Sequence, residues 1–359
     1  MKKEEIRVAV LCTSRCDTGC QHCFCNSGKN GDDLSLDAIR ALKKSIKNFK
    51  GTVTICFTGG GEPLMWSNLP KAISILRTLP NVHFGMVTSG CLDKKDERLA
   101  ILKEVFKVEK KIMFNHSFNS FSPSFHQRLA FTLPYILTKG RYVETHVKLV
   151  ANFEQDPENQ DEYRLYFSET VNSFERALKE AVGYCSRQVY LTDDNLFNFE
   201  KVKAVLKQEN PAYIDAWLRF QAFTAETVYR PYNLFFRQRK ITTSLSTPAL
   251  LGRAGRFSSL RTASYNYSSL GLCCSASTGG LNLSPQGKFL LCCHQPNFPP
   301  ISLGKPGDDL EKMLKIKRHL FLKNLNLPGQ LISETKSIFS PCANCVDRAW
   351  EFYLKSGKG

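Results

Sequence analysis

Strand-like and helix-like segments alternate through the first half of the chain. Apolar and β-branched runs, as expected of buried strands, occur at residues 6–12, 52–61, 83–90, 111–118 and 144–152. Segments with apolar side chains at helical spacing lie between them, at residues 34–49, 68–79 and 97–110. Ser35 is the expected N-cap of the first helix. This alternation predicts βαβ units and an α/β fold with a parallel sheet.

Three cysteines follow the first predicted strand in a CxxxCxxC frame, at Cys16, Cys20 and Cys23. The 14 cysteines of the chain come without a signal peptide or a membrane-spanning run, so we expect a cytoplasmic protein with reduced thiols. Clustered thiols there more often bind metal than form disulfides. Thiolates at this spacing can hold three irons of a [4Fe–4S] cluster; a zinc half-site or reduced structural thiols are the alternatives.

A glycine turn, "FTGGGEPLM", follows the second predicted strand. Glycine lets the backbone approach a ligand, and the carboxylate of Glu62 beside the turn can receive an ammonium group. Taken alone, the segment is also an ordinary turn before a helix. Ligands of parallel sheets collect at the carboxyl ends of the strands. The cysteine loop, the glycine turn and Thr88-Ser89-Gly90 are therefore expected at one edge of the sheet.

Together these residues resemble the radical S-adenosylmethionine (SAM) superfamily. The residues that match its cluster ligands are Cys16, Cys20 and Cys23, and those that match its ammonium-binding motif are Gly60, Gly61 and Glu62. Ser89 lies in the segment that matches the end of the third strand. Ser117 begins the segment similar to Ser-x-Asp, in which Asn119 replaces Asp. Two departures are His22, where an aromatic residue is usual, and Gly59, which lengthens the glycine run.

The resemblance implies a partial (β/α)6 barrel within residues 1–220 and a reduced cluster that cleaves SAM to a 5′-deoxyadenosyl radical. That radical would abstract a hydrogen from the substrate. The protein would orient the cofactor and the substrate and exclude competing reactions. An electron donor such as flavodoxin or ferredoxin is implied as a partner. Cys91, just past the third strand, is a candidate hydrogen donor, and a buried structural thiol is the alternative.

A second group of cysteines lies near the carboxy terminus. The segment "LNLSPQGKFLLC" predicts a β-hairpin with a Pro-Gln-Gly turn that leads into a thiol. A cysteine before it and a CxxC after it complete a four-thiol set, consisting of Cys274, Cys292, Cys342 and Cys345. An all-cysteine site binds either zinc or an iron–sulfur cluster.

This spacing resembles the SPASM/twitch extension of radical SAM enzymes. Only Cys273 and Cys293 are left over, each beside a matched ligand, so the resemblance implies a single auxiliary [4Fe–4S] cluster in the twitch form. The expected organisation is a barrel at 1–220, a linker or bridging region at 221–265 and a twitch domain at 266–359.

The formal net charge of +16, from 49 basic and 33 acidic side chains, favours an anionic partner. We expect an oxidoreductase that modifies a ribosomally made peptide by epimerisation, crosslinking or oxidation. A dehydrogenase or epimerase of a small molecule such as an aminocyclitol is the alternative. A zinc-stabilised nucleic-acid-binding protein is a remote alternative, because it leaves the glycine turn without a purpose. Neither a membrane nor a nucleic acid is expected as a partner.

Overall fold

The computed structural model describes most of the first third of the chain and several later segments. The described residues are 5–20, 23, 25, 27–58, 60–118, 128, 131–132, 135–136, 145–149, 186–187, 232–236, 239–246, 280–292, 301–320 and 352–355. For residues 115–118, 145–149, 186–187, 232–236 and 239–246 the description covers the backbone alone.

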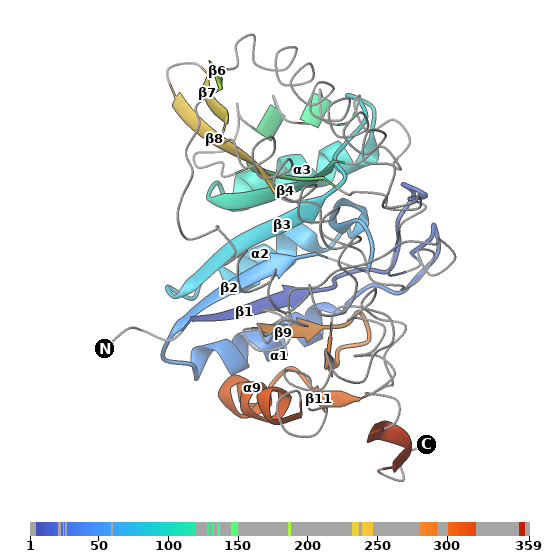
Figure 1. Ribbon diagram of the computed structural model, residues 1–359, viewed down its shortest axis with the longest axis vertical. Helices are drawn as coiled ribbons and strands as arrows, with labels where there is room; N and C mark the ends of the chain where they lie inside the picture. Colours follow the sequence, from blue (N-terminus) through green and yellow to red (C-terminus); the bar gives the residue numbers. More distant parts are fainter. Residues whose placement is uncertain are drawn as a thin grey trace, which may run out of the picture.

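An 11-stranded mixed sheet forms the centre of the fold, in the order β11-β10-β9-β1-β2-β3-β4-β5-β8-β7-β6 (Figure 1). Its strands are β1 (Glu5–Val10), β2 (Thr52–Phe57), β3 (Val82–Thr88), β4 (Ile112–Phe118), β5 (Thr145–Leu149), β6 (Ser186–Arg187), β7 (Tyr232–Phe236), β8 (Arg239–Ser246), β9 (Gly280–Leu283), β10 (Phe289–Leu290) and β11 (Ser302–Gly304). Seven neighbouring strands, from β9 across to β8, are parallel. Antiparallel strands extend both edges. The predicted α/β class and its first five strands are confirmed, whereas closure into a partial barrel stays a prediction.

Three helices connect the first four strands, as the sequence predicts. They are α1 (Leu36–Lys47), α2 (Leu69–Leu76) and α3 (Glu97–Val108), with a 3-10 turn η1 (Pro63–Met65) before α2. α1 packs beside α2, and α2 packs beside α3. The Ser35 side chain accepts a hydrogen bond from the backbone N–H of Ala38, which confirms the predicted N-cap.

The core lies between these helices and one face of the sheet. β1 and β2 bury every second side chain completely or nearly so, namely Ile6, Val8, Val10, Val53, Ile55 and Phe57. The alternating residues, such as Arg7 and Thr54, are exposed or half-buried. Parallel strands covered on both faces usually show continuous hydrophobic runs. The alternation therefore leaves the second face of β1 and β2 only partly covered.

The predicted hairpin near the carboxy terminus is confirmed, and it belongs to the main sheet. β9 and β10 pair in antiparallel fashion around Gly287, whose φ of 71° suits a turn glycine. β9 also pairs in parallel with β1, and the Nζ of buried Lys317 on α9 (Leu310–His319) donates to Gly280 O at 2.7 Å. β7 and β8 of the expected linker continue the same sheet at its other edge. The proposed domain boundaries stay predictions.

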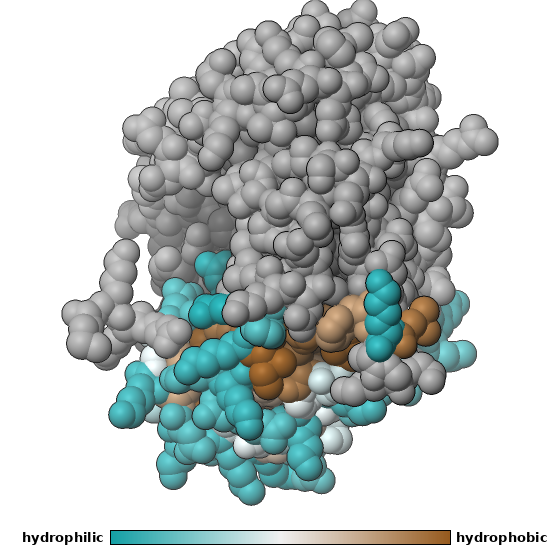
Figure 2. Space-filling model, turned by 60° about the horizontal axis from the view of Figure 1, so that its bottom comes forward, coloured by the Kyte–Doolittle hydropathy of each residue, from teal (hydrophilic) through white to brown (hydrophobic). Residues whose placement is uncertain are grey.

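The surface near α9 carries part of the positive charge. Figure 2 shows hydrophilic residues around an apolar strip on this face. Lys312, Lys315 and Arg318 of α9 are exposed. In the described part of the chain, the exposed large hydrophobic side chains are Ile316, at 40%, and Leu354, at 63%. Among the described residues, no helix combines the length and apolar character needed to cross a membrane.

Candidate functional site

Three loops meet at the carboxyl ends of β1, β2 and β3, as the sequence predicts. The cysteine loop follows β1, the glycine turn follows β2, and Ser89 and Gly90 follow β3. The backbone N–H of Glu62 donates to Arg15 O at 2.8 Å, which joins the glycine turn to the cysteine loop. Side chains from all three loops can therefore act on one ligand.

Glu62 is the centre of this edge. Its side chain is 3% exposed and accepts four hydrogen bonds. Oε1 accepts from Leu64 N at 3.1 Å and from Thr88 Oγ1 at 2.6 Å. Oε2 accepts from both the backbone N–H and the hydroxyl of Ser89, each at 2.7 Å. A carboxylate has about four acceptor positions, so these donors fill it.

The glycine turn is tightly packed against the cysteine loop. Gly60 has a φ of 90°, in the left-handed region that favours glycine. A Cβ at Gly61 would lie 2.7 Å from Thr13 O, too close for any other residue. The glycines are therefore needed for contact between two loops. Their predicted role in binding SAM stays a prediction, and Gly59 lies outside the described residues.

Arg15 and Asp33 hold the start of the cysteine loop. Arg15 donates from Nε at 3.0 Å and from Nη2 at 2.6 Å to the two oxygens of Asp33. Nη2 also donates to Met65 O at 2.7 Å, and Thr13 Oγ1 donates to Asp33 at 2.6 Å. Paired guanidinium–carboxylate bonds are among the stronger polar contacts in proteins. The loop entrance is thus fixed independently of the thiols.

The three thiols of the predicted cluster site are half-buried in this loop. Burial raises the pKa of Cys16, while hydrogen bonds from the hydroxyl and backbone of Thr18 lower it; nearby Cys23 adds to the rise. Cys23 N donates to Cys20 O at 3.2 Å, which forms a tight turn. In the described part of the chain, no three His, Cys, Asp or Glu side chains are gathered closely enough to hold a metal. The cluster ligands Cys16, Cys20 and Cys23 stay predictions.

Cys25 is a neighbour of this site that the sequence motif does not contain. Its Sγ accepts a hydrogen bond from Gly60 N at 3.2 Å, and burial raises its pKa to about 12. Cys23 and Cys292 are near enough to influence that pKa. The hairpin thiol expected at an auxiliary site therefore lies near the cysteine loop. None of the eight described cysteines forms a disulfide.

Two buried arginines, each 5% exposed, hold the residues between Cys16 and Cys20. Arg98 Nη1 donates to Asp17 at 2.9 Å, and its Nε donates to Asp96 at 2.8 Å. Arg128 Nη1 donates to Thr18 Oγ1 at 3.0 Å and to Ser89 Oγ at 3.1 Å. Arg128 Nε is buried without a hydrogen-bond partner in the described structure. A buried guanidinium with an unused donor is well suited to an anionic ligand.

The remaining predicted residues are resolved only in part. Cys91 is fully buried, its N–H donates to Thr132 Oγ1 at 2.7 Å, and burial raises its pKa to about 12. This environment suits the alternative that Cys91 is a buried structural thiol. Its role as a hydrogen donor stays a prediction. Ser117 lies in β4, but its side chain is outside the description. The other residues outside the described part are His22, Asn119, Cys273, Cys274, Cys293, Cys342 and Cys345.

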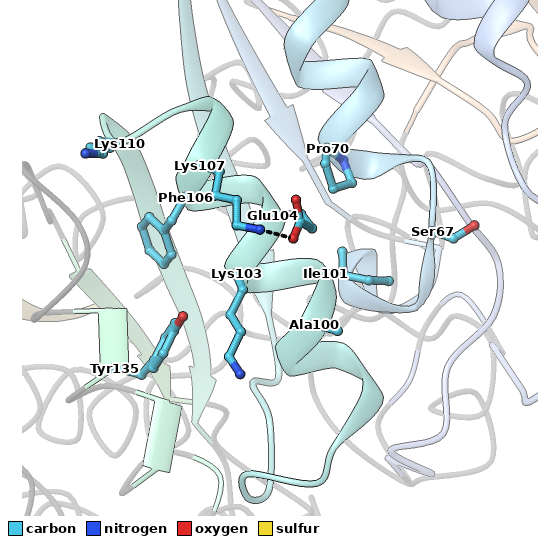
Figure 3. A pocket seen from close by; sticks show the side chains of 10 residues that line it. All are labelled: Ser67, Pro70, Ala100, Ile101, Lys103, Glu104, Phe106, Lys107, Lys110 and Tyr135. Carbon is cyan, nitrogen blue, oxygen red and sulfur yellow. Dashed lines mark hydrogen bonds and ion pairs between the residues drawn. The ribbon is translucent and has the colours of Figure 1, made fainter.

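A separate pocket of about 800 Å³ lies beside α2 and α3 on the helical layer (Figure 3). Lys103, Lys107 and Lys110 line it together with Tyr135, and Lys107 forms an ion pair with Glu104 at 2.6 Å. None of its lining residues is a member of the Glu62 site. Its position on the helical layer distinguishes it from the loops at the strand ends.

Part of the chain is similar to a known protein family. Residues 10–148 match the family model described as the Radical SAM superfamily. A stretch of 106 residues is 32% identical to 7,8-dihydro-6-hydroxymethylpterin dimethyltransferase of Methanocaldococcus jannaschii, covering 29% of this chain and 21% of that protein. The chain thus spans about a fifth of that curated relative.

Similar solved structures are more distant in sequence. The structure of anSMEcpe with bound AdoMet shares 13% sequence identity at a TM-score of 0.48, and the match covers 98% of this chain and 97% of that one. BtrN in complex with AdoMet and 2-DOIA shares 12% sequence identity at a TM-score of 0.43, and the match covers 94% of this chain and 99% of BtrN. Streptococcus suis SuiB bound to precursor peptide SuiA shares 15% sequence identity at a TM-score of 0.44, and the match covers 93% of this chain and 67% of SuiB. On the match at residues 10–148, this chain carries a radical SAM superfamily domain.

Proposed function

We propose that the chain is a radical SAM enzyme whose cofactor site is the meeting point of the loops after β1, β2 and β3. The observation that carries this proposal is the position of Glu62. It is a buried carboxylate at the strand ends, bonded to the glycine turn and the third strand and joined by its backbone to the cysteine loop. A primary ammonium would bind this carboxylate in place of one of its present donors, such as the Ser89 hydroxyl, which can rotate away.

The donor chemistry of the cysteine loop fits an iron–sulfur cluster. Cys16, Cys20 and Cys23 would supply three thiolates and leave one iron for a further ligand. When bound, the cluster would supply the electron that cleaves SAM to a 5′-deoxyadenosyl radical. Glu62 and the Gly60-Gly61 backbone would hold the methionine ammonium. Arg128, with its buried and unused Nε, would receive the carboxylate.

The carboxy-terminal cysteines would hold one auxiliary [4Fe–4S] cluster in a twitch-type domain. Cys292 supports this proposal because it lies two residues after β10 of the predicted hairpin, near Cys25 of the cysteine loop. The other proposed ligands are Cys274, Cys342 and Cys345. A structural zinc site is the alternative for the same thiols.

We propose an oxidoreductase reaction on a ribosomally made peptide, with a small molecule such as an aminocyclitol as the second substrate class. The net charge of +16 supports an acidic peptide, because it raises the local concentration of anionic partners. Flavodoxin or ferredoxin would supply electrons in the cytoplasm. The relative named as a dimethyltransferase makes methyl transfer a further candidate, but its match covers only 29% of this chain.

Metal analysis and ligand binding test the class of site. Protein reconstituted without oxygen should be brown, contain about eight irons in two clusters, and bind SAM. Colourless protein with stoichiometric zinc would overturn the proposal. The substrate is tested by incubation with short acidic peptides encoded beside this gene, and the expected product is a mass change of the peptide that requires SAM.

A further inference from the structure

The pocket on the helical layer lies outside the Glu62 site, and the proposed function gives it no role. Its volume is about 800 Å³, and it extends over the exposed face of α3 to Ser67 and Pro70 at the start of α2 (Figure 3). Clefts that bind ligands in proteins have volumes of about 300–1,000 Å³. This pocket is therefore large enough to hold part of a partner molecule.

Positive charge dominates the polar lining of this pocket. Three exposed lysines, Lys103, Lys107 and Lys110, face a single carboxylate, that of Glu104. Lys107 and Glu104 pair at 2.6 Å, and their side chains are 71% and 53% exposed. Among the described residues, Lys103 and Lys110 form no ion pair. Two ammonium groups of the pocket are thus free to bind an anionic group.

Apolar side chains lie on both sides of the Lys107–Glu104 pair (Figure 3). Ile101 is half-buried on one side, and Phe106 is on the other, with its ring centroid 6.3 Å from that of half-buried Tyr135. A small inorganic anion would use the lysines and leave these apolar surfaces in water. A peptide segment with both acidic and apolar side chains would use the two kinds of surface together.

We propose that this pocket binds an acidic, extended peptide segment that also carries apolar side chains. Its carboxylates pair with Lys103 and Lys110, and its apolar side chains cover Ile101 and Tyr135. The hollow shape favours such a segment over a folded acidic protein, because a stable interface between folded proteins buries about 800 Å² on each partner and needs a broader face. That the segment belongs to the substrate rests on the proposed function. The pocket would then recognise one part of the peptide, while the Glu62 site serves the reaction at another part.

The test is fluorescence anisotropy of a labelled, glutamate-rich peptide with interspersed leucines, titrated with the full chain in the absence of SAM. The assay requires neither a loaded cluster nor SAM cleavage, so its outcome is separate from that of the proposed function. The pocket variant removes the three lining charges by combining Lys103→Gln, Lys107→Gln and Lys110→Gln. These side chains are exposed, so the variant should keep the wild-type circular dichroism spectrum.

The matched control removes the same amount of charge from another helix. It combines three exposed lysines of α1 and the turn after it, as Lys44→Gln, Lys47→Gln and Lys50→Gln. Lys50 lies just after α1, as Lys110 lies just after α3. The net charge of the chain is therefore equal in the two variants, and only the place of the change differs.

An exposed ion pair typically contributes up to about fivefold in affinity. We expect the pocket variant to bind the peptide about tenfold more weakly than wild type, and the α1 control to stay within about twofold. Glu104→Gln should bind about two- to fivefold more tightly, because it releases Lys107. Asp37→Asn releases Arg40 on α1 in the same way and should leave the affinity unchanged.

Equal losses in the pocket variant and the α1 control would overturn the proposal, because the peptide would then respond to net charge alone. An unchanged affinity in the pocket variant would overturn it as well. Binding of flavodoxin that depends on the pocket lysines, without peptide binding, would assign this face to the electron donor instead. Peptide binding that follows the expected order in a protein that never cleaves SAM would support the pocket and refute the proposed function.

Discussion

Replacing Glu62 with Gln tests whether this carboxylate organises the three loops before any ligand binds. The amide has nearly the same shape, but one of its two acceptor oxygens becomes an NH2 donor. In either orientation the NH2 faces one hydroxyl and one backbone N–H, because each Glu62 oxygen accepts one of each. The hydroxyl can rotate and accept, whereas the backbone N–H is left unpaired.

The cost follows from these contacts. A buried, unpaired N–H costs about 1–3 kcal/mol, and the remaining bonds weaken when their acceptor loses its charge. Together we expect Glu62→Gln to lower the free energy of unfolding by about 3–5 kcal/mol. SAM affinity should also fall about 10- to 150-fold, as for the loss of one charge-assisted hydrogen bond.

Chemical denaturation of the metal-free protein, followed by circular dichroism, measures the first effect. Glu104→Gln is the control, since its partner Lys107 is 71% exposed and such pairs contribute about 0–1 kcal/mol. Glu62→Gln should unfold at clearly lower denaturant than wild type, and Glu104→Gln at nearly the same concentration. Equal midpoints for Glu62→Gln and wild type would refute the hydrogen-bond network described for Glu62.

Three further perturbations test other parts of the account. Burial would raise the pKa of Asp96, but hydrogen bonds from Arg98 outweigh it and lower that pKa to about 2. The ionised Asp96 therefore stabilises the folded protein above about pH 4, and this contribution is lost as the pH falls through about 2. Denaturation midpoints of Asp96→Asn should therefore decrease less than those of wild type over that range, and parallel curves would contradict this. Joint Ala replacement of Cys342 and Cys345 should halve the iron content and lower thermal stability, whereas unchanged iron would place the auxiliary site elsewhere. Ser35→Ala should cost about 1 kcal/mol in the same denaturation assay, and no loss would show that the cap is unimportant.

The local features of the fold could be predicted from sequence because their signals are local. The buried alternation of β1 and the N-cap at Ser35 depend on residues close together in the chain. The meeting of three loops followed from parallel strands, whose carboxyl ends share one edge.

The partners of the site residues could not be predicted, because they come from distant segments. Arg128 and Thr18 are 110 residues apart, and Arg98 and Asp17 are 81 apart. A buried arginine in a helical pattern has no sequence signal that names its partner. The pairing of β9 with β1 is similar, because a short apolar run predicts a strand but not its neighbour.

The most direct test of the central claim is the formation of 5′-deoxyadenosine from SAM by the reduced, reconstituted protein. We predict that wild type forms it, and that the triple variant with Ala at Cys16, Cys20 and Cys23 does not. The triple variant should still retain the spectrum of the auxiliary cluster. Equal 5′-deoxyadenosine from the triple variant and wild type, or none from wild type loaded with iron and sulfide, would contradict the account.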